Sequence, residues 1–504
     1  MTSPSLTVLH LVGSGDSQFY FECSFLYAKN VCRFVEENVK NYFALLLPDA
    51  GPLAGPGRVA LIEDEIPSEL SAGELLDGLA ENVTVVSVSA FLGLMGHDRH
   101  FRHPIQLVIP HMFDRAGMTT WRMLMEDVLH LPVAGMSGAS NVVGQDKTAT
   151  RLALGQLRRP GVGPGLVPRG FAIRQGDGAM EDLATLMERV REEAGGFPVM
   201  IKSPLEDNSR GVHLVGKSYE RGKRELGPAA SGEQLQKLEK ELTAELREKL
   251  EDVFKYGDVA LFEEFILGRE FRCGVIEQAH GAGLERYSAG TPSADKATTD
   301  AAETHLAPIP IMLEYVMTNP DMPIRTAADK LSKGEQGQMV MTKCTRRYVS
   351  CRPDKCTKPD AVTDNDQAVH PIEAALQEEI EAIVRQAHEA LGCGSYSLFD
   401  VRVDDTDPSR PRPYLLECCA FWSFTPVSAI SLMLKASGLD WERVVLDLWR
   451  GMALDEGAAN ARVSRAAVAK APSRGAVNGT SAEGSYNEWI ENAQSKRADA
   501  HNER

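Results

Sequence analysis

The chain has 504 residues, and its 71 acidic side chains outnumber its 54 Lys and Arg side chains, which gives a net charge of −17. An acidic chain without a basic tract is a poor partner for nucleic acid or for an anionic membrane surface, so we expect neither partner. No run reaches the roughly 20 apolar residues of a membrane helix, and no signal peptide is recognisable. Nine cysteines, an odd number, are typical of reduced thiols. We therefore expect a cytoplasmic protein with about three domains.

The first predicted domain, residues 1–131, alternates strand-like and helix-like segments. We expect strands over 6–12, 83–89 and 105–109, and helices over 19–42 and 118–130. Strands that alternate with helices predict an α/β domain with a doubly wound parallel sheet. Gly13-Ser14-Gly15 follows the first strand, but three residues of a glycine-rich turn are weak evidence for a nucleotide site.

Two further regions with strands and helices follow, over residues 132–275 and 276–454. We expect strands at 197–203, 212–215, 262–277, 396–403 and 413–418, and helices at 148–157, 234–254, 372–391 and 427–452. Residues 455–504 are rich in Ala, Ser, Asn, Gly and charge, a composition that predicts a disordered tail.

The predicted helix 234–254 carries apolar residues at an average spacing of 3.6. They are Leu235, Leu238, Leu242, Leu246, Leu250 and Val253. This stripe favours packing onto the helix's own domain, with a coiled-coil partner as the alternative.

Four segments have patterns that suit chemistry. In the first, a Gly- and Ser-rich turn from Gly135 leads to Asp146-Lys147 and a helix, which suits an anion at the helix start; a capped helix in a surface loop is the alternative. In the second, Lys202 ends an apolar strand, and a Gly/Ser loop at 204–211 follows. Such a loop can wrap a polyphosphate while the lysine neutralises it, unless Lys202 simply pairs with Glu206.

The third segment, Leu261–Phe271, places acidic residues beside Ile266 after a strand start. Glu263 and Glu270 suit the base edge and ribose hydroxyls of a nucleoside, and solvated charges are the alternative. In the fourth segment, Asp400 and Glu417 lie in apolar strands of an expected hairpin. A divalent cation would offset their repulsion, since Mg²⁺ binds carboxylates together with phosphate oxygens; salt bridges to arginine are the alternative.

These four segments, in this order, resemble the ATP-grasp superfamily and its D-alanine:D-alanine ligase branch. The resemblance covers residues 5–450 and is sharp at 132–151, 197–215, 259–272 and 394–432. It implies an N-terminal pre-ATP-grasp domain and a nucleotide held between two α+β subdomains, 132–275 and 276–454. It also implies an ATP-dependent carboxylate–amine ligase that works through an acyl phosphate and uses Mg²⁺ or Mn²⁺.

The resemblance assigns roles residue by residue. The implied ATP-binding residues are Lys147, Lys202, Glu206, Asn208, Ser209, Gly211, Glu263, Glu264, Ile266 and Glu270. Asp400 and Glu417 match the metal carboxylates, and Cys419 stands where the family has a metal-side Asn. Ser209 belongs to the phosphate loop that shields the reaction, and Glu22 loosely matches an amine-binding Glu, with a solvated helix-face acid as the alternative.

The family's Arg two residues before the metal Asp is here Leu398. Strand alternation places Leu398, Asp400 and Arg402 on one face. We therefore expect Arg402 to stabilise the charge that develops on the reacting groups, or else to pair with Asp404 or Asp405.

The substrate side diverges from the family. Ser428 falls where a family Ser holds a substrate carboxylate, and Phe421, Trp422 and Phe424 would line the same pocket or belong to the core. A pocket with three aromatic side chains makes a cell-wall D-alanyl-D-alanine product doubtful, so we expect another amino acid or amine and a carboxylic acid as substrates.

Residues 320–366 lengthen the region of the family's lid loop, where Arg325 or Lys330 would contact phosphate. Cys344, Cys351 and Cys356 have poor zinc spacing and are expected to be thiols. The competing interpretations are an enzyme of this fold that phosphorylates or carboxylates another nucleophile, and a catalytically silent ATP-binding protein. A homodimer is expected only by family analogy.

Overall fold

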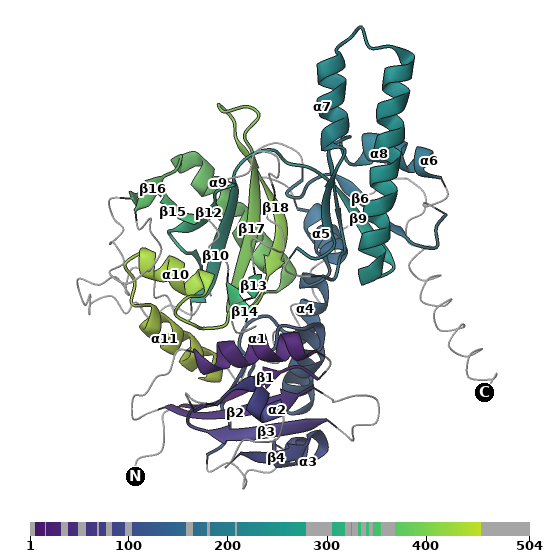
Figure 1. Cartoon of the computed structure of the whole chain (residues 1–504). Coiled ribbons are helices and arrows are strands. Elements are labelled where there is room, and N and C mark those ends of the chain that lie inside the picture. The colour runs from purple at the N-terminus through teal and green to yellow at the C-terminus, as the bar shows by residue number, and fades with distance from the viewer. Residues whose placement is uncertain are drawn as a thin grey trace, which may run out of the picture. The chain divides into compact units, whose positions relative to one another are not determined.

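The computed structural model of the chain (Figure 1) describes residues 6–15, 17–31, 39–48, 57–67, 70–76, 83–95, 103–157, 165–178, 182–206, 209–278, 305–317, 324, 331–333, 339–341, 346–353 and 368–454. All of them lie in the first of two compact units, Met1–Ala466 and Ala467–Arg504. The predicted tail from residue 455, together with Asn208, Arg325, Lys330, Cys344 and Cys356, lies outside the described residues. In the described part, no helix is long and apolar enough to cross a membrane.

The N-terminal sheet has five strands in the order β4-β3-β2-β1-β5. These strands are β1 (Leu6–Gly13), β2 (Val39–Leu47), β3 (Arg58–Glu63), β4 (Thr84–Ser87) and β5 (Leu107–Pro110). β1 runs parallel to β2 and β5, whereas β3 and β4 are antiparallel, so the sheet is mixed rather than all-parallel as predicted.

The helices of this region are shorter than predicted. They are α1 (Gln18–Lys29), α2 (Ala72–Leu76), α3 (Val88–Met95) and the π-helical turns η1 (Gly117–Trp121) and η2 (Leu124–Val128). The helix predicted over 19–42 is wrong at its end, because residues from Val39 form β2. The six residues from Tyr42 to Leu47 are all buried, so this strand has apolar side chains on both faces and no alternation to mark it.

Gly13 ends β1 in a backbone conformation that favours glycine, with φ +104°, and a Cβ there would lie 2.1 Å from the carbonyl oxygen of Leu46. We expect Gly13→Ala to lower stability by about 2–4 kcal/mol, since the strained φ and the clash add. Thermal unfolding would show this as a lower melting temperature. Gly93→Ala is the matched control, because a Cβ at Gly93 in α3 meets nothing within 4 Å. Equal melting temperatures for the two variants would contradict this account.

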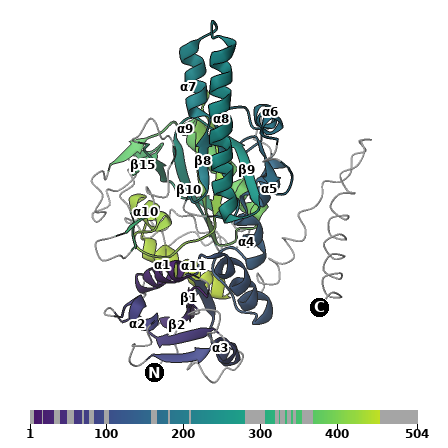
Figure 2. The same cartoon turned by 45° about the vertical axis from the view of Figure 1, so that its right-hand side comes forward.

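A second sheet of four strands has the order β6-β9-β7-β8, with all its neighbours antiparallel. Its strands are β6 (Gly170–Arg174), β7 (Val199–Lys202), β8 (Val212–Val215) and β9 (Val259–Glu264). The helices α6 (Leu183–Glu193), α7 (Lys217–Leu226), α8 (Gly232–Val253) and the turn η3 (Phe254–Tyr256) belong to the same region. Figures 1 and 2 both show α7 and α8 side by side as a long hairpin.

The C-terminal half of α8 packs on this sheet, as its apolar stripe predicts. Leu242, Leu246 and Leu250 are at most 1% exposed and share one core with strands of the sheet. Leu238 contacts α7, because a Cβ built on Gly222 would meet the Leu238 side chain at 2.8 Å. Packing within the domain therefore uses most of the stripe, and Leu235 alone among its members remains 38% exposed.

The third sheet has seven strands in the order β16-β15-β12-β10-β17-β18, with β11 paired to β10. The strands are β10 (Glu270–Gln278), β11 (His305–Pro308), β12 (Met312–Tyr315), β15 (Arg346–Ser350), β16 (Val369–Pro371), β17 (Tyr396–Asp404) and β18 (Arg412–Cys419). β13 (Leu331–Lys333) and β14 (Met339–Met341) form a separate pair. The single strand predicted over 262–277 is in fact β9 and β10 in two different sheets, so the domain boundary predicted at residue 275 falls inside β10.

The helices around the third sheet are α4 (Gly138–Gly144), α5 (Lys147–Gly155), α9 (Ala374–Leu391), α10 (Ala429–Ala436) and α11 (Trp441–Leu454). Strand β17 separates two environments. Phe399, Val401 and Val403 join the core under α9, as strand alternation requires. Asp400 and Arg402 point to the opposite face, where they meet the second sheet across a pocket.

Candidate functional site

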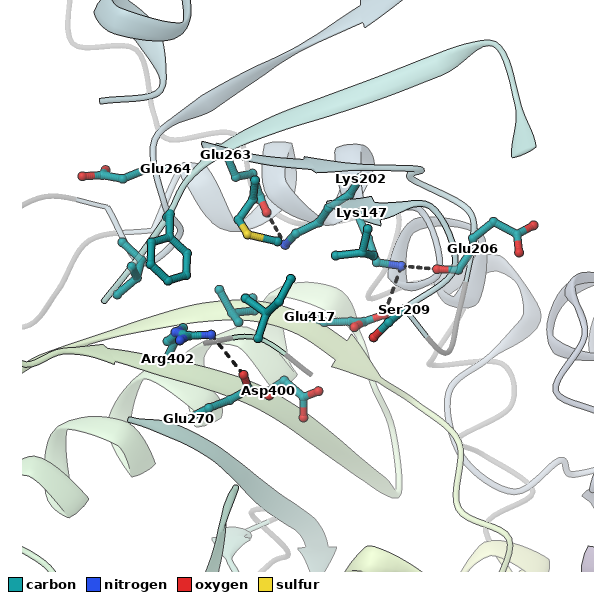
Figure 3. Close-up of a pocket in the computed structure, with 16 residues that line it drawn as sticks. Lys147, Lys202, Glu206, Ser209, Glu263, Glu264, Glu270, Asp400, Arg402 and Glu417 are labelled. Atoms are coloured by element: carbon teal, nitrogen blue, oxygen red, sulfur yellow. Dashed lines mark hydrogen bonds and ion pairs between the residues drawn. The ribbon is translucent and has the colours of Figure 1, made fainter. Parts of the chain in front are cut away.

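One pocket brings together residues of the second and third sheets. It is lined by Lys147, Met200, Lys202, Glu206, Ser209, Val212, Glu263, Glu264, Phe265, Ile266, Glu270, Ile324, Asp400, Arg402, Leu416 and Glu417. Figure 3 shows Lys147, Lys202 and Glu263 on one side, facing Asp400, Arg402 and Glu417 on the other. The four segments singled out in the sequence therefore converge on one place.

Lys147 is the first residue of α5, whose N-terminus is capped by the Asp146 side chain. Its ammonium group donates to the backbone carbonyl of Glu206 at 2.7 Å and lies 3.1 Å from a carboxylate oxygen of Glu417. The Lys147 side chain is only 9% exposed, so the alternative of a capped helix in a surface loop does not describe it. One ammonium group thus joins the start of α5, the loop after β7, and β18.

Lys202 ends β7 and is 8% exposed. Its ammonium group pairs at 2.5 Å with Glu263, on the neighbouring strand β9, and not with Glu206 as the sequence alternative had it. Arg151 approaches the other oxygen of Glu263 at 3.6 Å, and burial lowers the pKa of its guanidinium although Glu263 opposes this. Glu263 is therefore a buried partner of two cations, not a solvated charge.

The loop after β7 bends in a way that suits a glycine-rich turn. Ser209 and Gly211 have φ of +61° and +59°, and the backbone N–H of Ser203 donates to the carbonyl of Gly211 at 2.9 Å. A Cβ on Gly211 would lie 2.9 Å from the ring of Tyr256, so the residue is confined as well as left-handed. Glu206 and Ser209 line the pocket, whereas Gly211 shapes the loop behind it.

The segment after β9 forms the apolar end of the pocket. Ile266 is 5% exposed and lines it, next to Phe265. Glu264 pairs with Arg169 at 3.0 Å, and its carboxylate points away from the other labelled side chains in Figure 3. The solvated-charge alternative therefore fits the Glu264 side chain better than a ligand contact does.

Asp400 and Glu417 are directly opposed across the antiparallel pair β17 and β18. Both carboxylate oxygens of Asp400 accept from Arg272 on β10, at 2.5 and 2.7 Å. Glu417 is more open, with 32% of its side chain exposed and one contact to Lys147. Asp400 thus forms the salt bridge to arginine that was the alternative, and it also lines the pocket.

The pocket carboxylates are candidate ligands for the Mg²⁺ or Mn²⁺ ion that the fold implies. Two opposed carboxylates supply the hard oxygen donors that such a cation prefers. Within the described ranges, no group of three or more His, Cys, Asp and Glu side chains is placed to hold a metal. Cys419 does not line the pocket, and burial raises the pKa of its thiol to about 12, so it stays protonated at neutral pH, whereas a thiol ligand must be deprotonated. The residues fit one cation, and the prediction of Cys419 as a third metal residue is not supported.

Arg402 is 4% exposed and donates to Glu270 at 3.3 Å, with its guanidinium 5.0 Å from the Phe265 ring centre. It lines the pocket as predicted, on the same face as Asp400. The alternative of an ion pair holds in kind, but the partner is Glu270. Of the two predicted partners, Asp405 pairs with Arg269 and Asp404 accepts from Thr406.

The predicted aromatic pocket needs correction. Trp422 and Phe424 are 1% and 0% exposed and stack at 4.4 Å in the core, as the structural alternative had it. The Trp422 indole N–H donates to the Ser428 hydroxyl at 2.9 Å, so Ser428 orients this ring. The ring centre of Phe421 instead lies 5.6 Å from that of Tyr27 on α1.

Glu22 also lies on α1 and accepts from Gln18 at 2.8 Å on an exposed helix face. This contact is compatible with a solvated helix-face acid, and the amine-binding role of Glu22 stays a prediction.

Several site residues were missed by the sequence reasoning. Met200 lies two residues before Lys202, and strand alternation would have found it. Leu416 sits in the irregular register opposite Asp400 and Val401, which no local pattern marks. Arg151 and Arg272 act as partners of predicted residues across strands or helices, and their pairing depends on the tertiary fold.

Comparison with known proteins gives two kinds of likeness, and no family model matches the chain. The curated D-alanine–D-alanine ligase of Parvibaculum lavamentivorans is 35% identical over 75 residues, 15% of this chain and 24% of that protein. That of Albidiferax ferrireducens is 32% identical over 100 residues, 19% and 28% of the two chains. The matched region thus spans about a quarter of the length of these relatives.

Solved structures match nearly the whole chain. The D-alanine–D-alanine ligase from Coxiella burnetii has a TM-score of 0.53 and 16% identity, covering 92% of this chain and 98% of that one. The VanG D-Ala:D-Ser ligase from Enterococcus faecalis has a TM-score of 0.54 and 16% identity, covering 89% and 99%. These likenesses confirm the predicted fold and leave the substrates open.

Proposed function

We propose that this chain, which has the ATP-grasp fold of the D-alanine–D-alanine ligases, is an ATP-dependent ligase that joins a carboxylic acid to an amine. The observation that carries the proposal is the convergence of Lys147, Lys202, Asp400 and Glu417 on one pocket. Had the lysines lain far from the carboxylates, no common triphosphate site would exist.

The pocket suits a nucleoside triphosphate from end to end. Ile266 and Phe265 offer an apolar surface for a base, and Glu270 lies beside them for ribose hydroxyls. The loop with Ser209 and the ammonium groups of Lys147 and Lys202 would hold the phosphates. On binding, each lysine would exchange its present carboxylate partner for phosphate oxygens.

The proposed reaction has two displacements. A carboxylate oxygen of the acid attacks the γ-phosphorus of ATP, the bond to the β,γ-bridging oxygen breaks, and ADP leaves. The nitrogen of the amine then attacks the carbonyl carbon of the acyl phosphate, and inorganic phosphate leaves as the C–N bond forms. The nitrogen loses a proton in this step, to the leaving phosphate or to solvent.

The protein contributes position and charge rather than covalent chemistry. The lysines and Arg402 neutralise charge on the phosphoryl group during both displacements. Ser209 and the loop around it would shield the acyl phosphate from water. A divalent cation at the carboxylates, when bound, would stabilise charge on the phosphate oxygens.

The proposed amine is an amino acid or a related amine, and the proposed acid is a carboxylic acid or an amino acid. Phe421 with Tyr27 and Phe113 forms an aromatic group where β18 meets the N-terminal domain, and it is the best candidate for a substrate wall. Because Trp422 and Phe424 belong to the core, they give no reason to prefer a large substrate.

The test is phosphate release from ATP and Mg²⁺ with pooled amino acids and small carboxylic acids, followed by mass spectrometry of the product. We expect ADP and phosphate to appear in equal amounts, only when an acid and an amine are both present. Transfer of ¹⁸O from labelled acid into phosphate would report the acyl phosphate. ATP binding without such release would favour a silent binding protein, and a phosphorylated product without C–N bond formation would favour another group transfer.

A further inference from the structure

The two carboxylates of the site are held very differently by their cationic neighbours. Asp400 receives two hydrogen bonds from the guanidinium of Arg272, one on each oxygen, whereas Glu417 lies 3.1 Å from the ammonium group of Lys147. A bidentate guanidinium–carboxylate pair is among the strongest ion pairs in proteins. The Asp400 side chain is 7% exposed and that of Glu417 is 32% exposed.

The position of Arg272 is set by the sheet. Arg272 and Asp400 are direct Cα partners in the antiparallel pairing of β10 with β17, so their side chains emerge side by side on one face. The guanidinium also lies 5.6 Å from the ring centre of Tyr315 on β12, the strand on its other side. The Asp400 carboxylate and the Tyr315 ring, on the two strands that flank β10, thus hold the Arg272 guanidinium between them.

Replacing the cationic partner by a metal ion therefore costs little free energy at Glu417 and much at Asp400. A metal that took Asp400 would have to displace or share a largely buried guanidinium, and an unpaired buried charge is costly. A metal that took Glu417 would compete with a lysine at a carboxylate that is 32% exposed. The described residues supply no third metal ligand to change this balance.

We propose that Arg272 is a built-in cation that occupies Asp400, so that the site takes a single divalent ion, held by Glu417. Arg272 is a positioning residue in this account, since it acts through Asp400 and does not line the pocket. The inference deepens the proposed function, on which its biological meaning rests. Its physical content is an affinity for the ion that can be measured with no nucleotide.

The experiment measures Mn²⁺ binding to the purified full-length chain without nucleotide, from the electron paramagnetic resonance signal of free Mn²⁺. We expect at most one weak site in the unmodified chain. In Arg272→Gln, Asp400 loses its cation and faces Glu417, so the two carboxylates together should bind Mn²⁺ about tenfold more tightly or better. Adding Asp400→Asn to this variant should abolish the gain.

Arg402→Gln is the matched control, because Arg402 is another largely buried cation on the same sheet face that pairs with Glu270 instead. It should leave Mn²⁺ affinity within about twofold of the unmodified chain, well under the tenfold that 1.4 kcal/mol represents. An equal gain in Arg402→Gln would overturn the proposal, since net charge would then explain the effect. No gain in Arg272→Gln would overturn it too.

A single variant keeps the test decisive if Arg272→Gln does not fold. Glu417→Gln should remove Mn²⁺ binding, with its melting temperature recorded. Retained Mn²⁺ binding in a folded Glu417→Gln variant would show that Glu417 is not the ligand and refute the proposal. Because the assay contains no ATP, its outcome is independent of whether the chain proves to be a ligase.

Discussion

Lys202→Met is expected to weaken ATP binding about a hundredfold and to lower kcat further by about 10²–10³. Lys202 is a buried ammonium at the end of β7 that lines the pocket, so it would meet phosphate oxygens directly. Hydrogen bonds to charged groups contribute about 1.5–3 kcal/mol, and 1.4 kcal/mol corresponds to tenfold in affinity. Loss of one group that stabilises developing charge usually costs the stated factor in rate.

Calorimetric titration with ATP and the steady-state ligase assay measure these two effects. Lys237→Met is the control, because Lys237 lies on α8 with 79% of its side chain exposed. Lys202→Arg should recover only part of the affinity, since a planar guanidinium does not replace a point charge. Lys202→Met leaves Glu263 with Arg151, so its melting temperature must accompany the binding data. Unchanged ATP affinity in a folded Lys202→Met variant would remove Lys202 from the site.

Mild acid is expected to destabilise the protein between pH 6.5 and 5. Burial lowers the pKa of His10 to about 4, against a weaker opposing effect of its hydrogen bond to Asn41, and burial likewise lowers the pKa of His388 to about 4. His111, 3.0 Å from His10, has its pKa lowered by burial and then by the charge of His10. In the unfolded chain these groups take up a proton near pH 6.5.

The folded state does not take up these protons until about pH 4, whereas the unfolded chain takes them up near pH 6.5. Protons therefore favour the unfolded chain. The stability that the neutral histidines allow is full above pH 6.5 and falls as the pH drops toward 4. Each buried histidine contributes up to about 1.4 kcal/mol per pH unit, so His10 and His388 together account for about 3 kcal/mol between pH 6.5 and 5. Most carboxylates protonate below this window.

Melting temperatures recorded at pH 7, 6 and 5 test this expectation. A loss of about 3 kcal/mol corresponds to roughly 3 °C in a chain of this size. His10→Gln and His388→Gln should each remove a large part of the pH dependence, because glutamine does not titrate. If both variants lose as much stability as the unmodified chain between pH 7 and 5, these histidines are not responsible.

His10 packs between two parts of the fold. Its ring stacks on Phe43 at 4.5 Å and meets Trp449 of α11 edge-on at 5.9 Å. A proton on His10 would therefore place a charge between the N-terminal sheet and α11.

The site residues that the sequence predicted well are those marked by a local contrast. Lys202 ends an apolar strand, and Asp400 interrupts one, so each charge stands out from its neighbours and implies a partner. Ser209 and Gly211 stand out because they belong to a short Gly/Ser loop that directly follows an apolar strand. Patterns of this kind depend on a few adjacent residues, so they can be recognised without knowledge of the fold.

The partners themselves were not predictable in this way. Glu263 is 61 residues from Lys202, and Arg272 is 128 residues from Asp400, so only the strand pairings bring them together. Local sequence favoured Glu206 for Lys202 because it is near in the chain. Trp422 shows the opposite limit, since an aromatic residue beside a site has the same local pattern whether it lines a pocket or fills the core.

The pairing of charges in the pocket also decides how a nucleotide is selected. Carboxylates outnumber ammonium and guanidinium groups in the pocket wall, and the chain as a whole is acidic. Such a wall exerts no long-range pull on a polyanion, unlike the electropositive clefts that steer anionic substrates from a distance. Under the proposed function, encounter with a nucleotide would therefore be unguided, and discrimination between nucleotides would depend on contacts made inside the pocket.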